Sequence, residues 1–197
     1  MRMLLMGPPG SGKGTQALRL ATTLGVPAIS TGEIFRSNIA AGTALGREVK
    51  DYTNAGVYVP DELTNRLVHA RLQDRDAAGG WLLDGYPRTL AQLRALDEIA
   101  VSTGHNLEAV VALEVDEEEL IRRLAQRAID EERADDTEEV IRHRQTLYRE
   151  QTEPLLAEYA GRSILATVDG AGAEGDVTRR ISDSLCRISS PGASSHG

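Results

Sequence analysis

The sequence predicts an α/β protein built on a five-stranded parallel sheet with helices on both faces. Short apolar runs alternate along the 197 residues with segments in which apolar residues recur at helical spacing. The first apolar run, residues 3–6, leads into the glycine-rich stretch GPPGSGKGT at residues 7–15, and helical spacing follows at once. Strand, glycine loop and helix in this order are typical of a phosphate-loop (P-loop) NTPase fold.

The first elements have clear boundaries. Residues 3–6 precede Gly-Pro, which predicts a short buried strand, and apolar spacing becomes helical over residues 14–24. A second strand is expected at residues 26–29. Ser30 and Glu33 then fit a capping box, so a helix should begin there.

Proline and glycine mark the next elements. A helix at residues 45–54 should stop at Gly56, and Pro60 should start another one. The apolar run 81–83 predicts a third strand, and a helix is expected over residues 89–101.

The C-terminal half repeats the alternation. The expected elements are a strand at 110–115, helices at 116–128 and 137–159, a strand at 163–168 and a helix at 176–188. Asp116 with Glu119 and Asp136 with Glu139 fit capping boxes at two helix starts. Pro154 should interrupt the longest helix, and the Ser/Gly-rich tail 189–197 should be disordered.

Composition excludes several classes of function. A formal net charge of −8 argues against binding to nucleic acid or to an anionic membrane surface. The single cysteine, Cys186, cannot form an internal disulfide, which fits a reducing, cytoplasmic compartment. No apolar run approaches the ~20 residues that a membrane-spanning helix needs. We therefore expect a protein that acts on small molecules, and we expect a monomer because no long exposed apolar face stands out.

The spacing Gly7-x4-Gly12-Lys13 is that of a phosphate-binding loop. Glycines let backbone N–H groups converge on an anion, the helix N-terminus adds partial positive charge, and Lys13 supplies a full charge. A plain glycine-rich turn is the alternative, but it requires neither the lysine nor the helix. The motif usually has Ser or Thr after the lysine as a magnesium ligand, whereas this chain has Gly14 and then Thr15. Asp84, at the end of a strand, is therefore the metal candidate, acting through water.

Arginines on an otherwise acidic chain indicate a second anionic ligand. Six of them stand out: Arg36, Arg88, Arg123, Arg127, Arg133 and Arg144. Arg123 and Arg127 are four residues apart, so they repel unless an anion lies between them. Taken singly, each could be a solvated surface charge, and Glu119 could pair with Arg123.

Five stretches together carry a family resemblance. They are GPPGSGKGTQ (7–16), ISTGEIFR (29–36), GVYVPDEL (56–63), DGYPRTLAQ (84–92) and RADDTEEVIRHR (133–144). In this set and order the chain resembles adenylate kinases of the short-lid type. The resemblance implies one kinase domain, 1–188, with a core at 1–29, 60–125 and 137–188. It also implies an AMP-binding insertion at 30–59 and a short lid at 126–136.

The resemblance also implies residue roles. ATP would be bound by Gly10, Ser11, Gly12, Lys13, Gly14, Thr15, Arg123, Arg127 and Gly172, and its Mg²⁺ would be held by Asp84 through water. AMP would be bound by Thr31, Arg36, Val57, Tyr58, Val59, Gly85, Tyr86, Pro87, Arg88, Gln92, Arg133 and Arg144. The phosphoryl transfer Mg·ATP + AMP ⇌ 2 ADP would rest on Lys13, Arg88, Arg123, Arg133 and Arg144.

The chain departs from some family members at two places. Only five residues separate Arg127 from Arg133 and none is a cysteine, so no structural zinc is expected. Near Gly172 no basic side chain is available for the ATP base, so contact there would be through the backbone. A UMP/CMP kinase and a nucleotide-binding switch without transfer activity are the alternatives. Gln92 favours AMP, and the arginine set disfavours a switch.

Overall fold

The computed structural model describes residues 1–130 and 137–189, and these form a five-stranded, all-parallel sheet in the order β2-β3-β1-β4-β5. The strands are β1 (Arg2–Met6), β2 (Ala28–Ser30), β3 (Trp81–Asp84), β4 (Ala109–Glu114) and β5 (Leu165–Asp169). The predicted α/β class and parallel sheet are confirmed. Strand β1 lies at the centre, so its carboxyl end delivers the glycine loop to the middle of the sheet edge.

One face of the sheet is covered by α1 (Lys13–Leu24) and α9 (Glu174–Ser189). Leu20 of α1 and Ile181 of α9 are buried in a cluster with Met3 and Leu5 of β1. These side chains alternate with Leu4 and Met6, which point to the opposite face. Burial on both faces explains why β1 is a continuous apolar run.

The opposite face is covered by α4 (Asp61–Leu72), α5 (Leu90–Thr103) and α8 (Leu155–Gly161). Val68, Leu93 and Tyr159 from these helices are buried in the cluster that contains Leu4 of β1 and Leu83 of β3. The short 3-10 turn Arg75–Ala77 leads into β3. Two apolar cores, one on each face, therefore fix the strand ends that carry the site.

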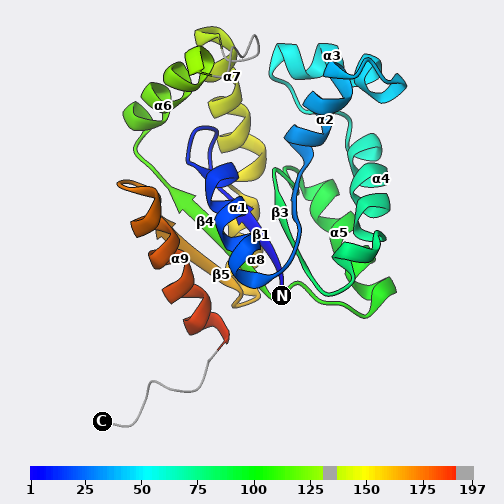
Figure 1. Cartoon of the computed structure of the whole chain (residues 1–197), viewed down its shortest axis with the longest axis vertical. Coiled ribbons are helices and arrows are strands. Elements are labelled where there is room, and N and C mark those ends of the chain that lie inside the picture. The colour runs from blue at the N-terminus through cyan, green and yellow to red at the C-terminus, as the bar shows by residue number, and fades with distance from the viewer. Residues whose placement is uncertain (131–136, 190–197) are drawn as a thin grey trace.

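Two pairs of helices project from the same end of the sheet (Figure 1). One pair is α2 (Thr31–Ala40) with α3 (Ala44–Ala55), and the other is α6 (Glu117–Asp130) with α7 (Glu138–Leu147). Helices α2 and α3 pack closely at Gly46, which has no side chain. A Cβ at this position would lie 2.0 Å from the Asn38 carbonyl oxygen. No described helix is long and apolar enough to span a bilayer.

Several element boundaries differ from the sequence prediction, and two of the differences have a clear local cause. Strand β2 starts at Ala28 because Gly25 ends α1 in the left-handed region and the Val26 N–H bonds to the Ala21 carbonyl. Asp136, predicted as a helix cap, lies outside the described residues, and Thr137 caps α7 by accepting from the Val140 N–H at 3.4 Å. The capping role of Ser30 is confirmed, since its hydroxyl accepts from the Glu33 N–H.

The expected long helix at 137–159 is interrupted earlier than predicted. A π-helical turn, Tyr148–Thr152, separates α7 from α8, and Pro154 follows it. Such a turn adds a residue to the helical repeat and turns side chains to a new direction, and it is common at functional sites. Here it buries Tyr148 and Thr152, and both line the cavity described next.

Candidate functional site

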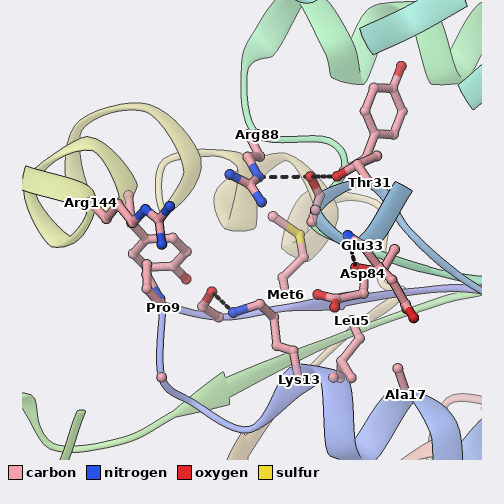
Figure 2. A pocket seen from close by; sticks show the side chains of 18 of the residues that line it. Leu5, Met6, Pro9, Lys13, Ala17, Thr31, Glu33, Asp84, Arg88 and Arg144 are labelled. Atoms are coloured by element: carbon pink, nitrogen blue, oxygen red, sulfur yellow. Dashed lines mark hydrogen bonds between the residues drawn. The ribbon is translucent and has the colours of Figure 1, made fainter. Parts of the chain in front are cut away.

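A cavity of about 960 Å³ lies at the carboxyl ends of β1, β2 and β3. In open α/β sheets this edge is the usual place for a ligand. Lys13, Asp84, Arg88 and Arg144 face a common space there (Figure 2). The cavity is large enough for a nucleotide-sized ligand.

The glycine loop forms one wall of the cavity. Gly10 and Gly12 have φ angles of 86° and 91°, in the region that favours glycine. A Cβ on Gly10 would lie 2.9 Å from both the Leu120 carbonyl oxygen and Leu124 Cγ of α6. Glycine is therefore required at this position by conformation and by space, and the loop lies directly on α6.

Lys13 follows this loop and donates hydrogen bonds to the carbonyl oxygens of Gly7 and Pro8, at 2.7 and 2.8 Å. Burial lowers the pKa of Lys13 from its ordinary value of 10.5 to about 8; Asp84 opposes this shift, and Arg88 adds to it. An incoming phosphate would supply the negative charge that favours the ammonium form. The electrostatics at Lys13 thus fit an anionic ligand.

Arg88 lies across the cavity from Lys13, and its side chain is held by a carbonyl oxygen and by an aromatic ring. Its Nε donates to the Gly85 carbonyl oxygen at 2.8 Å, and the Thr31 hydroxyl donates to the same oxygen at 2.9 Å. The guanidinium stacks over the Tyr58 ring, 5.1 Å from its centroid. A Cβ on Gly85 would lie 2.9 Å from Thr31 Oγ1 and Arg88 Nη2, so only glycine fits.

Thr152, from the π-helical turn, joins Tyr58 to the backbone of Arg88. The Thr152 hydroxyl lies 2.9 Å from the Arg88 carbonyl oxygen and 2.9 Å from the Tyr58 hydroxyl. A carbonyl only accepts, so Thr152 donates to Arg88 and Tyr58 donates to Thr152. The sequence analysis missed Thr152 because no local signal predicts where a π-helical turn will direct its side chain.

Gln92 is buried, with 1% of its surface exposed, and lines the cavity from the first turn of α5. Its Oε1 accepts from the Arg88 N–H at 2.7 Å, and its Nε2 donates to Asp61 Oδ1 at 2.7 Å. Thr89 caps α5 and donates to Asp61 Oδ2 at 2.9 Å. Asp61 is a second residue that the sequence analysis missed, because its partners are about thirty positions away.

The α6–α7 side supplies further cations. Arg123 donates to Glu119 Oε1 at 2.6 Å and to the Gly170 carbonyl oxygen at 3.2 Å. Hydrogen bonds from Arg122 and Arg123 lower the pKa of the Glu119 carboxyl. Arg144 donates to the Thr53 carbonyl oxygen at 3.2 Å and therefore links α7 to α3. The alternative of a Glu119–Arg123 surface pair is present, but Arg123 also lines the cavity.

The structure brings most of the predicted residues together. The cavity lining includes Gly10, Gly12, Lys13, Gly14, Thr15, Thr31, Arg36, Val57, Tyr58, Val59, Asp84, Gly85, Tyr86, Pro87, Arg88, Gln92, Arg123, Arg127 and Arg144. Ser11 is a buried residue of the loop, and neither Ser11 nor Gly172 is in the lining. Arg133 lies outside the described residues. The roles of all these residues stay predictions.

Asp84 and its surroundings fit a site for Mg²⁺. Asp84 is a buried carboxylate at the end of β3, and carboxylate oxygen is a ligand type that Mg²⁺ prefers. Thr15 lines the same cavity, so a metal carried by a nucleotide would meet a carboxylate oxygen and a hydroxyl oxygen there. Within 1–130 and 137–189, no group of three or more His, Cys, Asp or Glu side chains could hold a metal ion.

Comparison with known proteins decides the family. The family model described as "Adenylate kinase" matches residues 5–164. The chain belongs to the adenylate kinase family. The predicted resemblance is thereby confirmed, and the sheet order and glycine loop fit this family.

Relatives from three bacteria show how far the similarity extends. An adenylate kinase of Nocardioides sp. is 57% identical over 185 residues, covering 94% of this chain and 97% of that protein. One of Clavibacter michiganensis is 54% identical over 184 residues, covering 93% and 92%. One of Thermobifida fusca is 51% identical over 185 residues, covering 94% and 98%. The similarity to these relatives therefore extends over nearly the whole length of the chain.

Proposed function

We propose that the chain catalyses reversible transfer of the terminal phosphoryl group of Mg·ATP to AMP, giving two ADP. One observation carries this proposal beyond family membership: a single cavity is lined by a phosphate loop on one side and by Arg88 and Gln92 on the other. A protein that only binds one nucleotide needs the first wall alone. Two walls fit two nucleotides placed end to end, as direct transfer requires.

The donor end is assigned to the glycine loop. Backbone N–H groups of Gly10, Ser11, Gly12, Gly14 and Thr15 and the N-terminus of α1 would hold the ATP phosphates. Lys13 would exchange its loop carbonyl acceptors for a phosphate oxygen. Arg123 and Arg127 would neutralise the outer phosphates, and the backbone near Gly172 would meet the base.

The acceptor end is assigned to the wall formed by α2, the segment after α3 and the β3–α5 loop. Arg36 and Arg88 would bind the AMP phosphate, and Gln92 would read the adenine edge. Thr31 and the backbone of Val57, Val59 and Gly85 would line the base pocket. Tyr58, Tyr86 and Pro87 would support this pocket through packing.

The transfer step needs no strong general base, since the attacking oxygen of AMP is already anionic. That oxygen forms a bond to the γ-phosphorus of ATP. The bond from the γ-phosphorus to the oxygen that bridges the β- and γ-phosphates breaks, and ADP leaves with that oxygen. Lys13, Arg88, Arg123, Arg133 and Arg144 would stabilise charge on the transferred group. Mg²⁺ held through water by Asp84 would supply further neutralisation of phosphate charge.

We further propose the division into a core, an AMP-binding insertion at 30–59 and a short lid at 126–136. The cluster of Phe35, Val49 and Val59 supports a separately packed insertion, because it is distinct from the two cores beside the sheet. Closure of these segments would exclude water, the competing acceptor. A cytoplasmic monomer is the state in which we expect the protein to act.

A coupled assay of ADP formation from ATP with AMP, CMP, UMP or GMP tests the proposal. Turnover should be fastest with AMP. Faster turnover with CMP or UMP would assign the chain to pyrimidine monophosphates instead. Tight ATP binding without turnover of any monophosphate would support a binding module and overturn the proposal.

A further inference from the structure

We propose that Asp61 is a positioning residue that determines base specificity by fixing the orientation of the Gln92 side-chain amide. The inference rests on the proposed function, in which Gln92 reads the base of the acceptor. It concerns the direction in which Gln92 presents its donor and its acceptor. Asp61 itself need not contact the nucleotide.

The two ends of the Gln92 amide are fixed by partners of opposite polarity. The backbone N–H of Arg88 only donates, so it requires Oε1, which lies 2.7 Å away. The Asp61 carboxylate accepts through both oxygens, from Gln92 Nε2 at 2.7 Å and from the Thr89 hydroxyl at 2.9 Å. If the amide were rotated by 180°, its Nε2–H would face the Arg88 N–H, and its Oε1 would face the Asp61 carboxylate oxygen. The network therefore selects one orientation.

This orientation leaves one donor and one acceptor in a fixed order. The Nε2 group carries two N–H bonds and Oε1 two lone pairs, and the Asp61 and Arg88 contacts use one of each. Adenine presents an N6–H donor beside an N1 acceptor, which matches the remaining pair. Hypoxanthine and guanine present O6 beside N1–H, the inverse order, and would need the inverted amide.

The position of Asp61 suits this task. It is the first residue of α4, where the helix N-terminus favours a carboxylate, and it spans to the N-terminus of α5 through Thr89 and Gln92. Gln92 is buried, so water cannot replace Asp61 as a partner without cost. Discrimination between purines thus depends on a contact between two helices.

The experiment compares kcat/KM for AMP and IMP, because IMP inverts the edge without adding the 2-amino group of guanine. In the parent chain AMP should be favoured on the order of 10³-fold or more. In Asp61→Asn the side chain can donate as well as accept, so the AMP-to-IMP ratio should fall at least about tenfold. Glu62→Gln removes the same charge from the exposed neighbouring position and should leave the ratio unchanged.

The outcomes separate the inference from the proposed function. A ratio in D61N within about twofold of the parent's overturns the inference, including the case in which both substrates lose activity equally. A parent chain that forms no ADP from AMP overturns the proposed function itself. If circular dichroism shows that D61N is unfolded, NMR of the parent chain provides the test instead. A strong cross-peak between the Arg88 backbone proton and the Gln92 Nε2 protons reports the inverted amide and overturns the inference; its absence, with slow exchange of the Nε2 protons, supports it.

Discussion

Replacing Thr152 by valine removes the hydroxyl that joins Tyr58 to the backbone of Arg88 while nearly preserving side-chain shape. Thr152 is 5% exposed, so the Arg88 carbonyl oxygen would face a methyl group instead of its donor at 2.9 Å. An unpaired buried acceptor costs about 1–3 kcal/mol. The half-buried Tyr58 hydroxyl can turn to water and should add little. We expect the variant to lose ~2 kcal/mol of unfolding free energy.

Thermal unfolding followed by circular dichroism measures this loss, which corresponds to a fall in Tm of about 4–8 °C for a chain of this size. Thr152→Ser keeps the hydroxyl and is the matched control. Because the Tyr58 and Thr152 hydroxyls lie 2.9 Å apart, a double-mutant cycle of T152V with Tyr58→Phe should give a coupling of about 0.5 kcal/mol. A T152V variant as stable as the serine control, or strictly additive effects, would refute the assigned network.

Three further results are expected. Arg88→Ala should lower turnover at least about a hundredfold with an unchanged circular dichroism spectrum; near-normal turnover would remove the acceptor-site assignment. Gly46→Ala should destabilise by about 2 kcal/mol or more in denaturant unfolding, since its Cβ would meet the Asn38 backbone, whereas Gly79→Ala has open space and should not. At pH 8, ATP binding should take up about half a proton, because phosphate raises the pKa of Lys13 from about 8 toward its ordinary value. Calorimetry in two buffers of different ionisation enthalpy measures this proton uptake. Equal uptake by the Lys13→Arg variant would contradict the assignment to Lys13.

Local sequence signals were sufficient for the sheet and the phosphate loop. An apolar run followed by glycines and a lysine at fixed spacing specifies a strand, a loop and a helix without distant partners, and α1 begins at Lys13. Ser30 capped α2 as predicted because a cap involves only the next three residues. Asp136 and Thr137 are adjacent residues of types that favour helix caps, and residue type alone could not show that Thr137 caps α7.

The missed parts of the site depend on distant contacts. The Thr152 hydroxyl bonds to residues 64 and 94 positions earlier, and Asp61 bonds to a residue 31 positions later. The resemblance identified Arg88 and Gln92, but it did not show that each is held by other side chains. Those supporting partners follow from how helices pack and from a π-helical turn, which periodicity does not encode.

The close contact of Gly10 with Leu120 and Leu124 has a consequence for how the chain can move. With no side chain between them, the phosphate loop and the first two turns of α6 lie in close contact, so we expect Lys13 and Arg123 to keep their relative positions when the chain moves. We therefore expect the proposed lid at 126–136 to hinge after Leu124. A bulkier residue at position 10 would act as a wedge and drive the lysine and the arginine apart.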